Sequence, residues 1–199
     1  MLAKNVIAPF RGKGVQNHLF SVPKKGTDKR RVILDLSRLN LQIPCPSFKM
    51  VSVKEVRRCI PPNAWLTSID LKDAYWHVPI APQFRKFLAF ALPEGTFAFQ
   101  AMPFGLNIAP RTFTKLTAVL VAQLREMGIQ CFAYLDDWLV VAESLAEATH
   151  HTEQVVRVLT NAGFIINREK SSLVPSQSIE WLGWTWDTGL SVWCSPRPR

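Results

Sequence analysis

The stretch Phe132-Ala133-Tyr134-Leu135-Asp136-Asp137-Trp138-Leu139-Val140-Val141 places two adjacent carboxylates in the middle of an apolar run. Two short apolar segments around a polar pair predict two buried strands joined by a tight turn. A buried carboxylate costs several kcal/mol unless it is paired or bound to a metal. A divalent cation would compensate this charge, and Mg²⁺ is the usual hard cation held by carboxylates and phosphates. An ordinary polar turn that carries two Asp residues also fits this segment taken alone.

A third carboxylate, Asp70, follows another apolar segment, Trp65 to Ile69. Two-metal phosphoryl transfer uses carboxylates to hold two cations roughly 3.5–4 Å apart, so that the attacking and the leaving oxygen are both stabilised. Asp70 with Asp136 and Asp137 would be the minimal set of ligands. The alternative for Asp70 is a helix N-cap, a position that Asp often occupies.

The positive charge of the chain is concentrated at its amino-terminal end. The whole chain has 199 residues and a formal net charge of +9. Residues 1–60 hold 13 Lys or Arg and 3 acidic residues, a net of +10, whereas residues 61–199 hold 11 basic and 12 acidic residues, a net of −1. This asymmetry predicts a surface that binds a polyanion. A solvated basic surface without a partner is the alternative.

Composition excludes several classes of protein. With 48% hydrophobic and 20% charged residues, the chain suits one globular domain or one domain with two lobes. No apolar run approaches the roughly 20 residues of a membrane span. The four cysteines are widely spaced and form no CxxC pair, so neither a zinc site nor a disulfide framework is indicated. We therefore expect an intracellular protein with free thiols, in the cytoplasm or the nucleus.

The pattern of segments predicts an α+β fold with antiparallel hairpins. Hairpins are expected over 20–34 and 87–100, short strands near 164–166, 181–182 and 190–193, and irregular chain over 1–16. Two Ser-x-x-Glu segments, Ser52 to Glu55 and Ser144 to Glu147, are typical of capping boxes that open helices. Another helix is expected from Pro110 to Gly128. Its apolar positions are Phe113, Leu116, Leu120, Leu124 and Met127.

The motifs and their order resemble the fingers and palm of reverse transcriptases over roughly residues 17–193. Tyr134 to Asp137 is similar to the YxDD box of that family, and Ile69 to Tyr75 to its first catalytic motif. The segments that resemble the remaining motifs are Phe20 to Asn40, Met102 to Phe113, Asn167 to Lys170 and Trp181 to Gly183. Asp73 to Ile80 and the residues after the Asp pair are most similar to DIRS-like retrotransposons, and Met102 to Phe113 to gypsy-type elements.

The resemblance implies fold, activity and catalytic residues. The fold would be a right-hand polymerase with fingers over about 1–44 and 78–108 and a palm over about 45–77 and 109–199, in which helices back an antiparallel sheet. The activity would be RNA-directed DNA polymerisation on a primed RNA or DNA template with dNTPs. Two Mg²⁺ ions would be required, with Mn²⁺ as a possible substitute. The catalytic residues would be Asp70, Asp136, Asp137 and Lys170. The Leu71 carbonyl would be a further metal ligand, and Lys170 would protonate the pyrophosphate.

The resemblance also implies substrate-binding residues. Lys24 and Arg31 would grip the triphosphate, since Arg offers a planar fork and Lys a mobile charge. Tyr75 would exclude a 2′-hydroxyl, and Phe104 would replace a Gln found in some relatives. Gly105 would let the backbone approach the nucleotide closely. The expected nucleotide pocket is completed by Asp73 and Ala74. The residues expected at primer and template are Pro110, Tyr134, Leu135, Trp181, Leu182 and Gly183.

Two further expectations concern context. The family continues after the primer-grip motif into a thumb, which we expect to be absent from a chain that ends at Arg199. RNase H and tyrosine recombinase domains would be encoded in the same element. The alternative to an active polymerase is a truncated, inactive or domesticated remnant that only binds nucleic acid. His150 and His151 are expected on a solvated helix face, without ligand spacing to another metal-binding residue.

Overall fold

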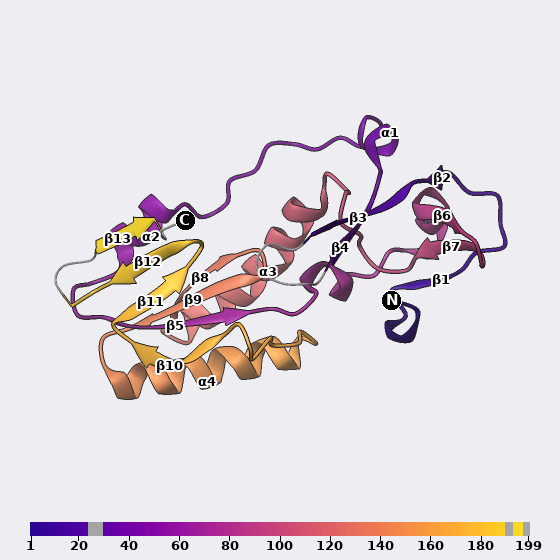
Figure 1. The fold of residues 1–199 in the computed structure, drawn as a ribbon. Helices are drawn as coiled ribbons and strands as arrows, with labels where there is room; N and C mark the ends of the chain where they lie inside the picture. The colour runs from indigo at the N-terminus through magenta and orange to yellow at the C-terminus, as the bar shows by residue number, and fades with distance from the viewer. Residues whose placement is uncertain (24–29, 190–192, 197–199) are drawn as a thin grey trace. The chain divides into compact units, whose positions relative to one another are not determined.

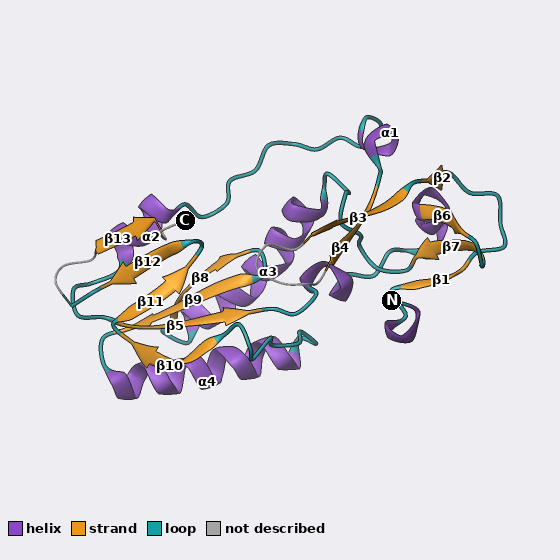
Figure 2. Ribbon diagram, viewed as in Figure 1, coloured by secondary structure: helices purple, strands orange, loops and turns teal. Residues whose placement is uncertain are grey.

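The computed structural model describes residues 1–23, 30–189 and 193–196 of the chain (Figure 1). It divides into two compact units. Unit 1 comprises Met1–Ser47 and Tyr75–Phe113, and unit 2 comprises Phe48–Ala74 and Thr114–Arg199. The mixture of helices and antiparallel strands (Figure 2) confirms the expected α+β class.

Unit 1 contains a four-stranded sheet and a separate hairpin. The sheet has the order β1-β7-β6-β2. Its strands are β1 (Ile7–Pro9), β2 (Gln16–Asn17), β6 (Ala89–Leu92) and β7 (Gly95–Phe99). The prediction of irregular chain over 1–16 was wrong, because Val6 and Ile7 are buried and β1 pairs antiparallel with β7. Phe90 and Phe99 form the centre of this core, with ring centroids 5.5 Å apart.

The hairpin of unit 1 consists of β3 (Leu19–Pro23) and β4 (Arg30–Leu34). Its register pairs Leu19 with Leu34 and Pro23 with Arg30. Its expected turn lies outside the described residues. The short helix α1 (Ser37–Asn40) follows β4. Unit 1 also contains the 3₁₀ helices η1 (Leu2–Lys4) and η3 (Pro82–Leu88). A further 3₁₀ helix, η2 (Ala74–His77), begins at the last residue of unit 2 before the chain enters unit 1.

Unit 2 is built on an antiparallel sheet in the order β10-β5-β9-β8. Its strands are β5 (Trp65–Asp70), β8 (Gln130–Tyr134), β9 (Asp137–Ala142) and β10 (Ser172–Ser176). The last five residues of β9 are all buried because both faces of the sheet are covered. One face packs on helix α4 (Leu145–Asn161), where Thr67 and Thr152 share a buried hydrogen bond of 2.7 Å.

The opposite face of the same sheet packs on helix α2 (Val53–Cys59) and on a second sheet, β11-β12-β13. The strands of this second sheet are β11 (Ser178–Trp181), β12 (Trp184–Asp187) and β13 (Trp193–Pro196). Val56, Leu66, Leu139 and Trp186 lie at the centre of the shared core and are completely buried. The expected capping box at Ser52 and Glu55 is present in α2, with both reciprocal hydrogen bonds formed.

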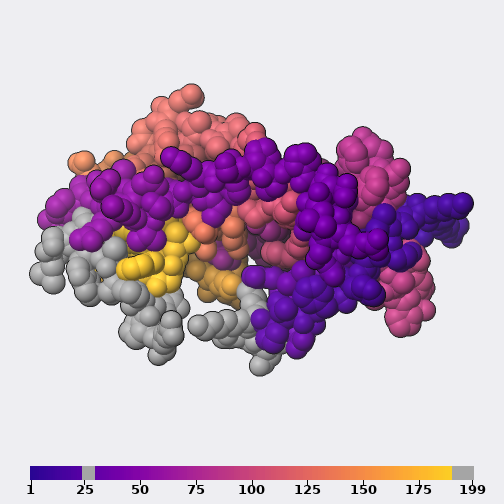
Figure 3. All heavy atoms as spheres, turned by 90° about the horizontal axis from the view of Figure 1, so that it is seen from above, coloured from indigo at the N-terminus to yellow at the C-terminus, as the bar shows by residue number. Residues whose placement is uncertain are grey.

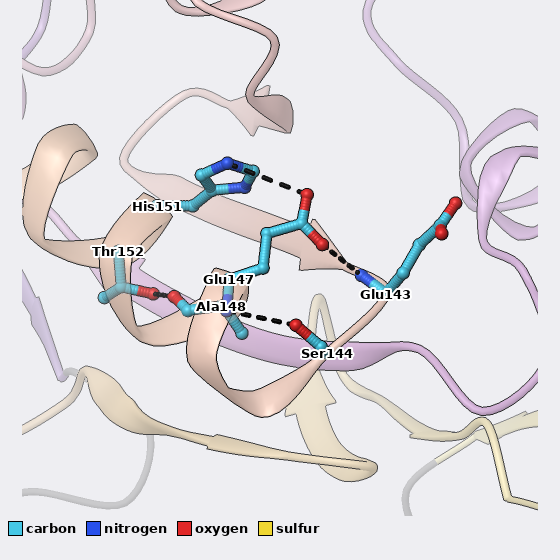
Figure 4. Close-up of polar contacts among 6 residues, drawn as sticks. All are labelled: Glu143, Ser144, Glu147, Ala148, His151 and Thr152. Atoms are coloured by element: carbon cyan, nitrogen blue, oxygen red, sulfur yellow. Dashed lines mark hydrogen bonds and ion pairs between the residues drawn. The ribbon is translucent and has the colours of Figure 1, made fainter.

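The N-terminus of α4 differs from the expected capping box (Figure 4). Ser144 accepts from the Glu147 amide at 3.2 Å, as expected. The Glu147 carboxylate, however, accepts from the Glu143 amide at 3.0 Å rather than from Ser144. Its other oxygen lies 3.8 Å from Nε2 of His151, whose side chain is only 13% exposed. His150 and His151 were both expected on a solvated helix face. This expectation is wrong for His151, whereas His150 is exposed.

Helix α3 (Ala109–Glu126) was expected to bury one apolar face, but only part of that face is covered. Phe113 and Leu124 are buried together with Thr117, whereas Leu116 and Met127 are exposed. A second error concerns 164–166, where Ile166 forms only an isolated bridge with Leu71 instead of a strand. Strand β10 had not been anticipated, because its sequence lacks an alternating apolar pattern.

Two expectations from composition are compatible with the structure. Within the described residues, no helix is both long and apolar enough to cross a bilayer. Cys45, Cys59 and Cys131 are free thiols. Burial raises the pKa of the Cys131 thiol to about 12, so this sulfur stays protonated at neutral pH.

Candidate active site

The three expected catalytic carboxylates come together in unit 2, at one end of the β5–β9 pair. Asp70 ends β5 and Asp137 begins β9, and the strand register places these two residues opposite each other. The Leu71 amide donates to the Asp136 carbonyl at 2.9 Å, which ties the end of β5 to the turn before β9. Strand pairing over six residues thus fixes the positions of the carboxylates.

The turn that carries Asp136 contains an unusual backbone conformation. Tyr134 pairs with Asp137, so the loop between β8 and β9 has only two residues, Leu135 and Asp136. Leu135 has φ 53°, a left-handed value that a bulky side chain rarely adopts. Such a conformation costs on the order of 1–3 kcal/mol and is found where the surrounding structure enforces it, often at functional sites. The two flanking strands supply that constraint here.

The electrostatics of the three carboxylates are unfavourable without a partner. Burial, followed by the negative charges of Asp136 and Asp70, raises the pKa of Asp137 from its usual 3.8 to about 6. The Lys170 ammonium acts in the opposite direction but does not cancel these effects. The cluster therefore holds more negative charge than its protein neighbours compensate.

We predict that Asp137→Asn stabilises the metal-free chain at neutral pH. Because the folded pKa of Asp137, about 6, exceeds its unfolded value of 3.8, the folded state binds more protons between these values. Stability should thus be full below about pH 4 and fall as pH rises through about 6, by about 2 kcal/mol after allowance for solvent screening. The Asn variant cannot titrate and should lack this fall.

Urea unfolding in EDTA at pH 4.5 and pH 7.5 would measure the effect. Asp187→Asn is a matched control in unit 2, because its Oδ1 can still accept from the Gly189 amide. An equal pH dependence in wild type and Asp137→Asn would contradict the assigned repulsion.

The donor chemistry of the cluster fits a divalent cation. Three carboxylates with uncompensated charge are ligands that Mg²⁺ or Mn²⁺ would accept. Within the described part of the chain, no group of three His, Cys, Asp or Glu side chains is already arranged so that it could hold a metal ion. The fit therefore rests on the placement and repulsion of the carboxylates. Asp70, Asp136 and Asp137 are the residues that would hold the metal, and Leu71 follows directly at the end of β5.

Lys170 lies in the loop between α4 and β10, is exposed, and is close enough to lower the pKa of Asp137. The same loop contains a residue to which the sequence had assigned no individual role. Asn167 donates its side-chain amide to Oδ1 of Asp70 at 2.6 Å. The only sequence signal was its place in the motif that ends at Lys170, which gave no reason for a contact across 97 positions.

Several residues expected at the nucleotide contact one another within unit 1. The Tyr75 ring lies against Phe104 and Phe113, with centroids 5.1 and 5.6 Å away. The Arg31 guanidinium lies 5.0 Å from the centre of the Phe104 ring, a cation–π distance. Tyr75, Phe104 and Arg31 thus form one connected group. Lys24 lies outside the described residues.

Gly105 follows Phe104 in the chain, and its backbone packs closely against the main chain of Leu34. A Cβ built on Gly105, which has φ +107°, would lie 2.1 Å from the Leu34 carbonyl oxygen of β4. The Leu34 amide also donates to the Phe104 carbonyl at 3.1 Å. Close approach to the nucleotide was the expected reason for glycine here; the structure gives packing against β4 as a sufficient reason.

Asp73 and Ala74, the other expected nucleotide residues, belong to unit 2. Asp73 has φ 53° and is partly buried, and Ala74 is buried at the start of η2. The residues expected to form the nucleotide pocket are therefore divided between the two units.

The expected primer residues have unequal exposure. Trp181 is only 3% exposed and packs on Trp186 with ring centroids 5.8 Å apart, so its ring cannot stack on a base. Leu182 and Gly183 form the turn between β11 and β12, with φ 52° and 74°. Positive φ at both central residues is typical of a type I′ turn. Trp181 therefore supports this turn from the core, and Gly183 is exposed.

Of the remaining expected primer and template residues, Pro110 lies in the first turn of α3, where its missing N–H costs nothing. Tyr134 ends β8 and is partly buried.

The basic residues of the amino-terminal region are exposed. In unit 1 the described ones are Lys4, Arg11, Lys13, Arg30, Arg31 and Arg38. The space-filling view shows this part of the chain, in indigo and violet, at the molecular surface (Figure 3). Exposure of the excess positive charge is the condition that a polyanion-binding surface requires.

Comparisons with known proteins agree with these features. Residues 22–186 match the model of the family described as reverse transcriptase (RNA-dependent DNA polymerase). The chain is 30% identical over 164 residues to the transposon Tf2-7 polyprotein of Schizosaccharomyces pombe, a match that covers 82% of this chain and 12% of that protein. It is 28% identical over 189 residues to the Pol polyprotein of transposon gypsy from Drosophila melanogaster, which covers 92% of this chain and 18% of that protein.

A structural comparison gives the same fold. The foamy viral protease–reverse transcriptase in complex with double-stranded DNA matches with a TM-score of 0.83 and 23% identity, over 94% of this chain and 32% of that one. This likeness confirms the expected fingers-and-palm fold. Because the family model covers most of the chain, including Asp70, Asp136 and Asp137, the protein belongs to the reverse transcriptase family as a domain related to those of retrotransposon polyproteins.

Proposed function

We propose that this chain is the polymerase core of a retrotransposon reverse transcriptase, which adds dNTPs to a primer 3′-hydroxyl on an RNA or DNA template. The observation that carries the proposal is the register of β5 and β9, which sets Asp70 opposite Asp137 beside the strained Leu135–Asp136 turn. The chain spans only 12% and 18% of the two curated relatives, so activity and partners are inferred for this domain.

The proposed mechanism assigns each group of residues a separate task. Asp70, Asp136 and Asp137 would hold two divalent cations, for which we propose Mg²⁺, with Mn²⁺ as a substitute. Such cations would supply positive charge that lowers the pKa of the primer hydroxyl and stabilises the leaving pyrophosphate. Lys170, whose ammonium interacts with Asp137, is the proposed proton donor to pyrophosphate. Leu182 and Gly183 hold the primer end in line for attack.

Unit 1 is proposed as the fingers and unit 2 as the palm, since the boundaries expected from the sequence lie within a few residues of the division observed. Arg31 and Lys24 would bind the triphosphate, and the exposed cations of unit 1 the template. We further propose a DIRS-like element, on the resemblance at Asp73 to Ile80, with RNase H and tyrosine recombinase encoded alongside and an intracellular location.

Primer extension on poly(rA)/oligo(dT) with dTTP tests the proposed activity. We expect elongation in Mg²⁺ that EDTA abolishes. A purified, folded chain that binds this template–primer but extends nothing in either Mg²⁺ or Mn²⁺ would refute the polymerase function and favour a binding remnant.

We predict that Tyr75→Ala weakens the discrimination between dTTP and UTP. Removing the ring from its contacts with Phe104 and Phe113 would open space for a 2′-hydroxyl. The ratio of kcat/KM for dTTP over UTP should fall roughly 10- to 100-fold, the range that one small group in a pocket produces. Tyr75→Phe keeps the ring and is the control. An unchanged ratio in Tyr75→Ala would remove Tyr75 from this role.

A further inference from the structure

The loop between α4 and β10 encloses the end of β5 by main-chain hydrogen bonds. The Asn167 amide donates to the Asp70 carbonyl at 2.8 Å, and the Lys72 amide donates to the Ile165 carbonyl at 2.8 Å. Leu71 and Ile166 stand opposite each other as an isolated bridge between these bonds. The loop therefore extends the antiparallel pairing beyond the end of the sheet. These bonds hold the main chain of Asp70, the last residue of β5, in place.

Two side chains of this loop reach Asp70 in different ways. Ser171 Oγ accepts from the Asp70 main-chain amide at 3.0 Å and donates to the Asn167 carbonyl at 2.8 Å. Asn167 instead donates its side-chain amide to Oδ1 of the Asp70 carboxylate at 2.6 Å. Ser171 thus holds the backbone of Asp70, whereas Asn167 holds the group that would bind a metal.

We propose that Asn167 is a positioning residue that orients the Asp70 carboxylate for metal binding, an inference that rests on the function proposed above. A carboxylate on a single χ1–χ2 pair can rotate away from its neighbours, especially when Asp136 and Asp137 repel it. The neutral amide restrains Oδ1 without cancelling the negative charge that attracts the cation. The second oxygen, Oδ2, keeps its full capacity as a ligand. Residues that orient metal ligands in this way typically change metal affinity or activity 10- to 100-fold when replaced.

The test measures Mn²⁺ binding to the whole chain directly, by the electron paramagnetic resonance signal of free Mn²⁺. Asn167→Ala should raise the apparent Kd for Mn²⁺ about tenfold. In primer extension, the Mg²⁺ concentration for half-maximal rate should rise by a similar factor, and high Mg²⁺ should restore most of kcat. A variant that is less stable but still fully folded at the assay temperature, as urea unfolding would verify, would show neither the shifted Kd nor the rescue.

Two controls separate orientation from folding. Asn161→Ala removes an exposed amide at the end of α4 and should bind Mn²⁺ as wild type does. Ser171→Ala removes the two backbone-directed bonds and should lower the unfolding midpoint while shifting the Mn²⁺ Kd less than Asn167→Ala does. Equal Kd shifts in Ser171→Ala and Asn167→Ala would overturn the proposal, because backbone support alone would then explain them.

The outcome for the wild-type chain distinguishes this proposal from the proposed function. If wild type binds Mn²⁺ and Asp70→Asn abolishes the binding, the metal site stands; an unchanged Kd in Asn167→Ala then refutes only the positioning role. If wild type shows no Asp70-dependent Mn²⁺ binding, the metal site and the positioning role are both refuted.

Discussion

Replacing Asp136 by Asn should lower the rate of primer extension at least about 1,000-fold while the chain remains folded. Asp136 lies in the two-residue turn between β8 and β9, and its carbonyl accepts from the Leu71 amide at 2.9 Å. That bond uses only the main chain, so the Asn side chain leaves it intact. Loss of one charged ligand from a two-metal site removes several kcal/mol of transition-state stabilisation. A loss of about 4 kcal/mol corresponds to a rate that is lower by about 1,000-fold.

The rate should be measured under single-turnover conditions, so that the chemical step is separated from template binding. Asp187→Asn makes the same chemical change on β12 and should retain wild-type activity. The template Kd should change little in either variant. Full activity in Asp136→Asn would mean that the turn between β8 and β9 is not the catalytic centre, whatever other residues hold the metal.

The parts of this site that the sequence could predict are those determined locally. The apolar segments around Asp136 and Asp137 and the apolar run before Asp70 required buried strands, and the structure has β8, β9 and β5 at these places. Ser52 and Glu55 formed their capping box because all of its donors and acceptors lie within four residues. The resemblance added the order of the motifs and the fingers-and-palm fold to which they belong.

What the sequence could not predict depends on contacts between distant segments. Asn167 is an ordinary loop residue until folding places its amide beside Asp70. Trp181 was expected among the primer and template residues, and only the folded structure shows that its ring is buried against Trp186. The same holds for Leu116 and Met127, whose spacing fits one apolar helix face but whose side chains are exposed.

Gly105→Ala should destabilise unit 1 by about 4 kcal/mol, a large share of the 5–15 kcal/mol typical of a folded domain. Two penalties add. At φ +107° an alanine is strained by on the order of 1–3 kcal/mol. Its Cβ would also lie 2.1 Å from the Leu34 carbonyl oxygen, which is backbone and cannot rotate away as a side chain could. Relieving such an overlap requires a backbone shift that costs typically 1–3 kcal/mol.

The surrounding hydrogen bonds oppose that shift. Asn40 donates its side-chain amide to the Gly105 carbonyl at 2.8 Å, and the Asn107 amide donates to Asn40 Oδ1 at 3.0 Å. Moving residue 105 away from β4 would stretch these bonds as well as the one from the Leu34 amide to the Phe104 carbonyl.

Gly95→Ala is the matched control for this prediction. Gly95 lies in the same unit with φ +134°, but a Cβ there would meet nothing within 4 Å. Urea unfolding of both variants would separate backbone strain, which they share, from the overlap with Leu34, which only Gly105→Ala has. A markedly lower unfolding free energy for Gly105→Ala would assign this glycine to the packing of the loop on β4. Equal losses in the two variants would show that the loop can move, and close approach to a nucleotide would then be the better reason for glycine at position 105.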